Sequence, residues 1–386
     1  MDLDYSEEQK IFRQAIRKFA ENEVAPLVED AEENHVFPLE LIPKMGKLGY
    51  LGVAFPEKYG GSADEDGFIT KINECIWHEE MSRVCAGIAF GCSAALAGAP
   101  GYIIRDFGSE EQKQKYLVPG IKGEKIGAFS LTEPDAGSDA AGIKATLSRD
   151  GSHYILNGNK VFCSNGNIAD YITVGAYTDK AKGVKGGISV IILEKGAPGF
   201  AIGQKFMKLG FRSAENVELV LSDCRIPSEN IVMKEGKGWP ILMSALNQCR
   251  VNMSADTVGV AQAALDSCVK YANERIQFGK PIGKFQAVAF KMAEMYTQIE
   301  AAKRLTYQAA WALFKESDSK SIVSAAKLFC SQMVSFVTTR AMEIFGGYGY
   351  MLDYPVQRYF RDARIFNFGY GTEEIQKLVI SRSLGL

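Results

Sequence analysis

The first 120 residues carry apolar side chains at helical spacing. Phe12, Ile16 and Phe19 recur every three to four positions, which is typical of an amphipathic helix. Small and apolar residues then fill positions 84–105, where the composition favours another long helix. The pattern predicts an all-helical N-terminal domain over residues 1–120.

The period of the apolar positions changes to two after about residue 121. Runs of β-branched and aromatic residues are separated by Gly, Asn, Asp and Pro, which is typical of strands joined by turns. We expect a middle domain over 121–235 that folds as an antiparallel β-barrel, or as the related sandwich. The strand-like runs are 154–158, 171–174, 188–192 and 217–221.

A helical pattern returns at residue 236. Long apolar-periodic stretches with short connections favour a four-helix bundle. The predicted helices cover roughly 241–275, 285–315, 320–348 and a last segment after Thr372. The order α, β, α predicts an α+β multidomain chain whose third domain spans 236–386.

The charge of the chain is nearly balanced, with 44 basic and 46 acidic residues and a net charge of -2. This balance gives no electrostatic reason to expect binding to nucleic acid or to an anionic membrane. A mean hydropathy of -0.07 and the lack of an apolar run near ~18 residues argue against membrane insertion. The acidic start lacks the features of a signal or transit peptide, so we expect a cytoplasmic protein.

The eight cysteines include no C-x-x-C pair, and the three histidines include no H-E-x-x-H motif. We therefore predict neither a disulfide framework nor a metal site. The two commonest nucleotide-binding loops, G-x-G-x-x-G after a strand and G-x-x-x-x-G-K-[ST], are also absent. Candidate chemistry must come from other segments.

Five short segments carry more specific information. In the first, the hydroxyls of Thr132 and Ser138 flank Gly137, which lets backbone amides approach a ligand closely, although an ordinary turn has the same composition. The segments are Leu-Thr-Glu-Pro-Asp-Ala-Gly-Ser-Asp at 131–139, Arg-Ile-Gln-Phe-Gly-Lys-Pro-Ile at 275–282, Phe-Gly-Gly-Tyr-Gly-Tyr at 345–350, Arg-Asp-Ala at 361–363 and Gly-Thr-Glu-Glu-Ile-Gln at 371–376. Together, in this order and spacing, they resemble the acyl-CoA dehydrogenase family over essentially the whole chain.

This resemblance implies an FAD cofactor held by two groups of residues. Arg275 suits a pyrophosphate because a guanidinium is bidentate and always charged, although a cation that complements a helix C-terminus has the same signature. Glu343 stands where the family usually has Gln and places an anion near an anionic cofactor. Along the flavin the resemblance places Phe129, Leu131, Thr132, Gly137, Ser138, Phe162 and Ser164. From a neighbouring subunit and the last helix it places Arg275, Gln277, Phe278, Gln286, Glu343, Gly346, Gly347, Thr372 and Glu374.

The resemblance also implies a substrate and partners. A cofactor site shared between subunits implies an oligomer, usually a homotetramer in this family. The substrate is an acyl-CoA, with Ser138, Arg250 and Gly371 near the thioester and the CoA. An electron-transfer flavoprotein is the family's usual redox partner. In the family's reaction a carboxylate removes the α-proton while hydride leaves the β-carbon for the flavin.

Neither position at which this family places its catalytic glutamate holds an acid. Tyr370 occupies the position before Gly371, and Cys249 occupies the position before Arg250. Their unperturbed pKa values are about 10 and about 8.5, so both are protonated at neutral pH and are poor bases. Such a pair suits an enoyl-CoA reductase, which runs the reaction in reverse.

A displaced acid is the other explanation. Our first prediction is an FAD-dependent acyl-CoA dehydrogenase acting on an alicyclic or otherwise conjugated acyl-CoA with a relocated proton acceptor. Asp256 lies seven residues after Cys249, on the same helical face and ~10 Å along the axis, although an ion-paired helix residue is the more ordinary interpretation. Residues 84–105 contribute no acid. The alternatives are the reductase, a flavin monooxygenase of the same fold, and an inactive paralogue.

Overall fold

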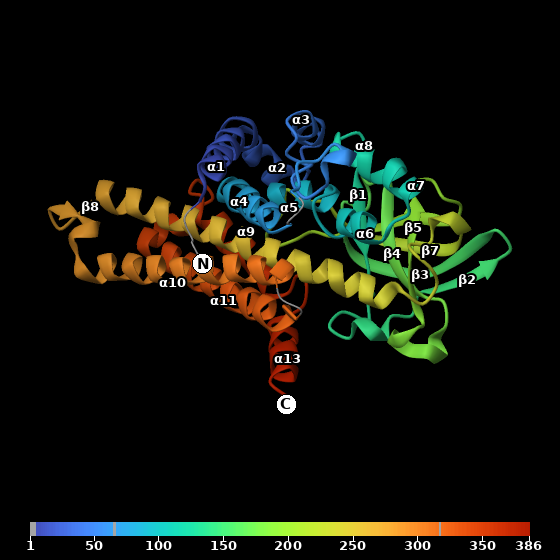
Figure 1. Cartoon of the computed structure of the whole chain (residues 1–386). Coiled ribbons are helices and arrows are strands. Elements are labelled where there is room, and N and C mark those ends of the chain that lie inside the picture. The colour runs from blue at the N-terminus through green and yellow to red at the C-terminus, as the bar shows by residue number, and fades with distance from the viewer. Residues whose placement is uncertain (1–4, 65–66, 316–317) are drawn as a thin grey trace.

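The computed structural model describes residues 5–64, 67–315 and 318–386 of the chain. The β domain lies at one end of the molecule and a small β-hairpin at the other, and the N-terminal helices lie against the C-terminal helices between them (Figure 1). The predicted three-domain order of helices, strands and helices is confirmed.

The N-terminal region is helical, as predicted. A capping box between Ser6 and Gln9 begins the first helix, because Ser6 and Gln9 satisfy each other's backbone N–H groups. The single helix expected over 84–105 is two helices, broken at 96–98 with Pro100 in the first turn of the second. The helices are α1 (Glu7–Phe19), α2 (Val28–Asn34), α3 (Leu41–Lys47), α4 (Phe68–Val84), α5 (Ala86–Ala95), α6 (Ala99–Phe107), α7 (Glu110–Gln112) and α8 (Val118–Ile121).

The middle region is one seven-stranded sheet, in the order β1-β4-β2-β3-β7-β6 with β5 on the other edge of β4. The expectation of purely antiparallel pairing is wrong in one detail, since β1 and β2 both pair parallel to β4. Strands β1 and β2 lie one after the other along the same edge of β4, and the loop 131–145 separates them. The strands are β1 (Gly127–Ser130), β2 (Thr146–Asp150), β3 (His153–Ser164), β4 (Tyr171–Tyr177), β5 (Ile188–Glu194), β6 (Phe200–Lys205) and β7 (Asn216–Pro227).

Three long helices form the C-terminal bundle. The predicted fourth long helix is only 11 residues long, and it packs mainly on α11 and projects from the bundle (Figure 1). Helix α4 of the N-terminal region packs along α9 and also contacts α10, so it supplies the bundle's fourth long member. The elements are α9 (Gly238–Glu274), β8 (Ile276–Gln277), β9 (Lys280–Pro281), α10 (Gln286–Lys315), α11 (Lys320–Phe345), α12 (Val356–Ala363) and α13 (Glu373–Ser383).

Two helical stretches are long and apolar enough to span a membrane by length and composition alone. These stretches are Ala86–Phe107 and Lys320–Tyr350. The protein buries 83% of the most apolar segment of the first and 56% of the most apolar segment of the second. Both therefore have the packing of core helices.

Candidate functional site

The predicted flavin segments of the middle domain lie side by side although they are far apart in sequence. The Val161 amide donates to the Thr132 carbonyl at 2.9 Å, and the Cys163 thiol donates to the Phe129 carbonyl at 3.5 Å. Phe129 and Leu131 thus approach the end of β3, which carries Phe162 and Ser164. The structure brings together the residues that the sequence analysis assigned to one ring-binding wall.

Glu133 anchors the loop that follows β1. Its carboxylate accepts hydrogen bonds from the Lys160 ammonium at 2.7 Å and from the backbone amides of Lys144 and Ala145. The loop tip with Gly137 and Ser138 remains exposed. A Cβ at Gly137 would meet no atom within 4 Å, so packing within this chain does not require glycine there. An open backbone at this position leaves room for a ligand.

Phe162 has a backbone conformation that costs energy. Its φ is 58°, a left-handed value that is rare for a bulky residue, and its side chain is 62% exposed. The ring packs against Phe206, with 5.2 Å between the ring centroids. An exposed aromatic ring on a strained backbone is a common feature of binding sites.

The second predicted cofactor group lies mostly at the opposite end of the molecule, except for Thr372 and Glu374, which lie at the start of α13. Arg275 and Gln277 line a cavity of about 570 Å³ together with Gly347 and Tyr348, and Phe278 is 93% exposed at the tip of the hairpin. Helix α9 separates the two ends, and its 37 residues correspond to ~55 Å. One cofactor molecule cannot touch both groups of the same chain. Gln286 and Gly346 belong to this end, where Gln286 begins α10 and Gly346 ends α11.

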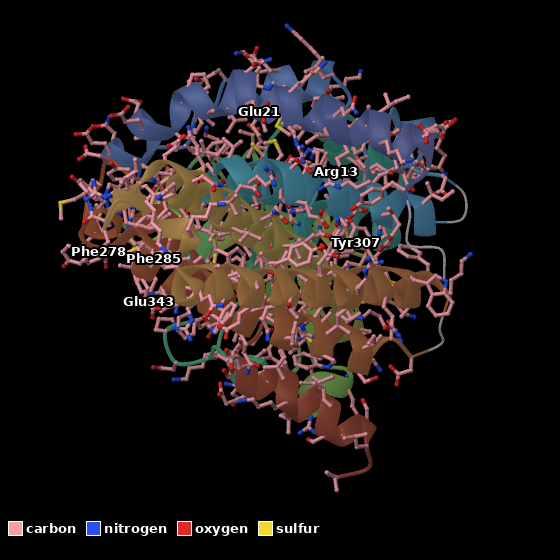
Figure 2. The ribbon with its side chains drawn as sticks, turned by 90° about the vertical axis from the view of Figure 1, so that its left-hand side faces the viewer. Arg13, Glu21, Phe278, Phe285, Tyr307 and Glu343 are labelled. Atoms are coloured by element: carbon pink, nitrogen blue, oxygen red, sulfur yellow. The ribbon has the colours of Figure 1, made fainter. Side chains whose placement is uncertain are left out.

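Glu343 does not present an uncompensated anion to this end. Its carboxylate pairs with the Lys291 ammonium at 2.7 Å and with the Arg340 guanidinium at 2.9 Å. These two cations hold the pKa of Glu343 below its usual range. Figure 2 shows Glu343 on the same side of the view as Phe278 and Phe285. The rings of Phe278 and Phe285 pack edge to face, with 6.1 Å between their centroids. The three side chains leave one net positive charge beside the hairpin.

The two positions that hold a glutamate in the family are neighbours in space. Cys249 is 1% exposed, and the partly buried Tyr370 packs against the core cluster that includes Cys249. Burial raises the pKa of Cys249 to about 12. Burial, together with the neighbouring thiol, raises the pKa of Tyr370 well above its usual value of 10.0. Both groups are therefore protonated over the physiological pH range, and neither is a base at pH 7.

The segment around Tyr370 is held by its carbonyl groups. The Arg250 guanidinium donates to the Tyr370 carbonyl at 3.1 Å. The Lys327 ammonium donates to the Gly371 carbonyl at 2.7 Å, and the Gln376 amide donates to the same carbonyl at 3.0 Å. Three donors from three helices thus support Tyr370, whose φ of 52° is strained.

These contacts give Arg250 a structural role and add a second buried cation, Lys327, that the sequence did not single out. Arg250 is 8% exposed and lies against the Tyr370 segment. Lys327 is also buried, and burial with the nearby Arg250 charge lowers its pKa to about 8. The signal for Lys327 in the sequence was a lone lysine inside an otherwise small and apolar helical run, Ser324 to Cys330.

Asp256 is paired with side chains of α4 in the N-terminal region. Its carboxylate accepts a hydrogen bond from the Ser82 hydroxyl at 2.7 Å and contacts the His78 ring nitrogen at 2.8 Å. The interpretation of Asp256 as a paired helix residue agrees with these contacts. Its assignment as a relocated proton acceptor has no support in the geometry.

Thr372 begins α13 as its N-cap. Its hydroxyl accepts a hydrogen bond from the Ile375 amide, as an N-cap threonine does. Hydrogen bonds from its own amide and from Thr372 lower the pKa of the exposed Glu374. The start of α13 therefore lies directly after the Tyr370 segment.

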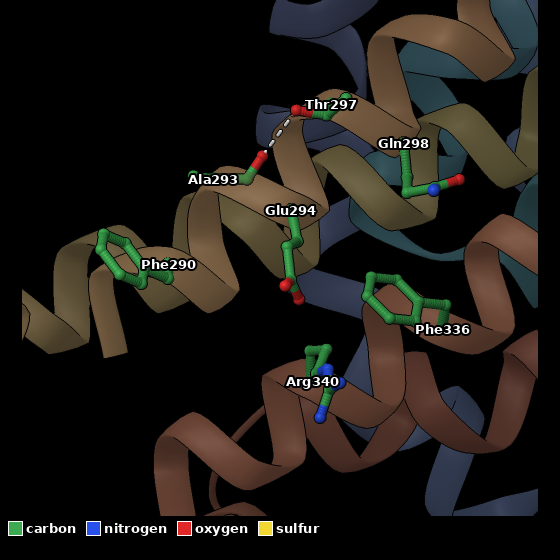
Figure 3. A pocket seen from close by; sticks show the side chains of 7 residues that line it. All are labelled: Phe290, Ala293, Glu294, Thr297, Gln298, Phe336 and Arg340. Atoms are coloured by element: carbon green, nitrogen blue, oxygen red, sulfur yellow. Dashed lines mark hydrogen bonds between the residues drawn. The ribbon is translucent and has the colours of Figure 1, made fainter. Parts of the chain in front are cut away.

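A cavity of about 670 Å³ on the bundle lies apart from these groups. Phe290, Glu294 and Phe336 line it with Arg340, between α10 and α11 (Figure 3). It includes none of the predicted site residues. Over the described ranges 5–64, 67–315 and 318–386, no group of three or more His, Cys, Asp and Glu side chains is placed to hold a metal ion.

The sequence matches three family models in the order of the three regions. Residues 6–124 match the acyl-CoA dehydrogenase N-terminal domain, 128–224 the middle domain and 236–385 the C-terminal domain. The fold and site thus define a CoA-thioester oxidoreductase of the flavoprotein type. The chain belongs to the acyl-CoA dehydrogenase family.

Similar proteins include both dehydrogenases and reductases. A short-chain specific acyl-CoA dehydrogenase of Clostridium acetobutylicum is 44% identical over 99% of both chains, and an acryloyl-CoA reductase (NADH) of Anaerotignum propionicum is 42% identical over 100% of this chain and 96% of that one. A caffeyl-CoA reductase-Etf complex subunit of Acetobacterium woodii is 38% identical over 98% of this chain and 99% of that one. The structure of butyryl-CoA dehydrogenase from Megasphaera elsdenii superposes with a TM-score of 0.95 at 41% identity, covering 100% of both chains.

FAD fits the residues present. The open loop at Gly137, the exposed Phe162 ring and the hydroxyls of Thr132 and Ser164 form one wall. Arg275 and the exposed Gly346-Gly347 backbone offer phosphate-type contacts at the other end. A Cβ at Gly346 or Gly347 would also meet no atom within 4 Å.

Proposed function

We propose that this protein is an FAD-dependent oxidoreductase that reduces a 2-enoyl-CoA, with Tyr370 as the proton donor. The observation that carries this proposal is the packing of Tyr370 against the core that includes Cys249, where desolvation raises the pKa of both groups and both keep their protons at neutral pH. A protonated group beside the reacting carbons suits delivery of a proton to an enolate more than removal of an α-proton.

Each side chain around the pair then has a defined task. The FAD supplies the hydride that reaches the β-carbon. The Tyr370 hydroxyl delivers a proton to the α-carbon, and Cys249 orients that hydroxyl. Arg250, Lys327 and Gln376 keep the Tyr370 segment in place through its carbonyl groups. Ser138 and Gly371 are the proposed contacts to the thioester, and the N-terminus of α13 favours the charge that develops there.

A second candidate is the dehydrogenation of an alicyclic or otherwise conjugated acyl-CoA. This reaction needs a carboxylate displaced from the α-carbon, and Asp256 is engaged by His78 and Ser82. Glu74 is the carboxylate whose charge acts most directly on Cys249. It is the acceptor that this second candidate would require.

The proposed partners follow from the family and the geometry. Because the two cofactor groups lie at opposite ends of α9, a second copy of the chain must complete each site, and a homotetramer is the proposed assembly. An electron-transfer flavoprotein is the proposed redox partner, consistent with the name of the Acetobacterium woodii relative. We expect the protein to act in the cytoplasm.

Anaerobic flavin absorbance tests the direction and the role of Tyr370. Photoreduced enzyme should be reoxidised by crotonyl-CoA or cinnamoyl-CoA at a rate that is flat from pH 6 to 9, because Tyr370 stays protonated. Bleaching of oxidised enzyme by butyryl-CoA should speed up by about tenfold per pH unit over the same range, since it needs the deprotonated group. Tyr370→Phe should slow reoxidation by about 10²- to 10⁴-fold.

Cys249→Ala is the matched variant, because it removes the neighbouring thiol and leaves the donor in place. A Tyr370→Phe enzyme that keeps the wild-type rate would exclude Tyr370 as the donor. Bleaching by a cyclic saturated thioester alone, with no pH slope, would support the second candidate. Product that forms only with oxygen would indicate a monooxygenase, and no flavin change with any thioester would indicate an inactive paralogue.

A further inference from the structure

A cluster of buried polar side chains lies beside Cys249, between α4, α6 and α9. Lys71 is fully buried and its ammonium donates to the Glu74 carboxylate and to the Asn252 amide oxygen, both at 2.6 Å. The Tyr102 hydroxyl donates to the same Glu74 oxygen at 2.5 Å. Asn252 lies one helical turn after Cys249 on α9, and the charges of Lys71 and Glu74 act on the Cys249 thiol. This polar cluster therefore borders the proposed reaction site.

Within the polar cluster, one acceptor atom has no hydrogen-bond donor. The Lys71 ammonium uses its three donors on Glu74, Asn252 and the Tyr102 hydroxyl at 3.3 Å. The Asn252 amide donates to Tyr102 and to the Ala97 carbonyl, and the hydroxyl of Tyr102 is engaged by Glu74. Both contacts to Glu74 go to Oε2. Within the described part of the chain, Glu74 Oε1 has no hydrogen-bond partner, and Glu74 is only 4% exposed.

Glu74 Oε1 is an acceptor, so its missing partner is a donor. Among the described residues, Glu74 Oε1 is not one of the unpaired atoms that are completely enclosed by protein. It therefore keeps some accessible surface. A buried carboxylate oxygen without a donor is costly, and the neighbouring protein groups have no donor left to give.

We propose that Glu74 Oε1 accepts a hydrogen bond from a hydroxyl group on the acyl part of the CoA thioester, so that the polar cluster selects hydroxylated acyl chains. This inference rests on the proposed function, because it takes the Tyr370–Cys249 pair as the place of reaction. Asn252 is three residues from Cys249, or ~4.5 Å along α9. The hydroxyl therefore lies several carbons beyond the α,β-pair, at the far end of a short chain or on a ring.

Two matched pairs of thioesters test the proposal with the purified holoenzyme. They are hex-2-enoyl-CoA with 6-hydroxyhex-2-enoyl-CoA, and cinnamoyl-CoA with 4-hydroxycinnamoyl-CoA. We expect kcat/KM for the hydroxylated member of at least one pair to exceed that of its plain partner by about 10- to 100-fold, the range for a hydrogen bond to a charged group. Calorimetric Kd values for the oxidised holoenzyme should show the same preference.

Variants separate recognition from proton transfer. Glu74→Gln should remove most of the preference, which is measured as the ratio of kcat/KM between the two members of a pair, so that any change common to both thioesters cancels. Tyr102→Phe should weaken the preference in the same direction, and it keeps the test valid if Glu74→Gln loses its FAD. The matched control is Glu80→Gln, a buried glutamate of the same helix that pairs instead with Arg13 and Arg17 of α1. This control should keep the full preference.

The outcomes are distinguishable from failure of the proposed function. If no thioester changes the flavin spectrum, the proposed function is wrong and the inference is lost with it. If plain and hydroxylated partners react equally in both pairs, the inference alone is wrong. If Glu74→Gln loses kcat on every thioester, Glu74 transfers a proton and the recognition role is wrong.

Discussion

Helix α9 has two long flanks with opposite chemistry. Toward α10 and α11 it meets an apolar core that includes Ala264, Leu265, Ile299 and Val337. Toward α4 it meets a smaller apolar cluster with Ile72 and Ile76. On this side it also meets buried polar side chains, with Lys71 and Glu74 at one level and His78 and Ser82 at the next. The two flanks show that a helix can be buried by apolar contact or with polar groups that pair with one another.

The polar flank lies on the side of the proposed chemistry. Its first level borders Cys249, which contacts Tyr370, whereas the apolar flank contains no predicted proton-transfer group. A buried ion pair is seldom a net source of stability, because desolvation offsets the attraction between its charges. We infer that the polar flank is retained for its contact with substrate, and the apolar flank for cohesion.

The largest expected effect comes from breaking the pair on the polar flank. Lys71→Met leaves the Glu74 carboxylate buried without its cation, and we expect a loss of about 3–5 kcal/mol in the free energy of unfolding. The double variant Lys71→Met with Glu74→Leu should recover most of this loss. Urea unfolding at fixed protein and FAD concentrations measures both. A single variant as stable as the wild type would show that the flank is not closely packed.

The apolar flank should respond to the number of atoms removed. Ile299→Ala creates a cavity among α9, α10 and α11, and we expect a loss of about 2–5 kcal/mol, against about 0.5–1.5 kcal/mol for Ile299→Val. The same unfolding experiment measures these values. Losses that do not grow from Val to Ala would mean that this flank collapses around the cavity, and the contrast between the flanks would disappear.

The smallest expected effect, at most about 1.4 kcal/mol per pH unit, concerns a charged group outside both flanks. The pKa of Lys327 falls from 10.5 to about 8 on folding. Between these values the unfolded chain binds more protons than the folded one, so stability increases as pH rises from about 8 toward 10.5. Relative to Lys327→Met, the wild type should therefore gain stability over this window. Thermal midpoints of both proteins at several pH values test the sign, and parallel curves would contradict it.

The sequence predicted the elements of the fold better than their partners. Periods of 3.6 and 2 located the helices and strands because these periods reflect local backbone geometry. They gave no sign that β1 and β2 share one edge of β4, since that depends on how the loop 131–145 is accommodated. They also did not show that α4 joins the bundle in place of α13.

For the site, the motifs predicted which residues matter but not how each is used. Tyr370 and Cys249 were expected near the reaction, and the structure packs Tyr370 against the core cluster that includes Cys249. Arg250 was expected at the CoA, and the structure adds that its guanidinium donates to the Tyr370 carbonyl. Lys327 was missed because a lysine in a helix is usually solvated, and only the packing of α11 against the α13 segment buries it.

The sequence by itself determined the order of domains, the family and the absence of a glutamate at both expected base positions. These properties are written in local patterns and in residue identities. Only the tertiary structure decided that Lys71, Glu74 and Asp256 are buried and paired. The helical period shows which residues share a face of a helix. The helix that covers this face comes from a segment roughly 180 residues away in the chain, so the pairing of these side chains depends on the tertiary fold.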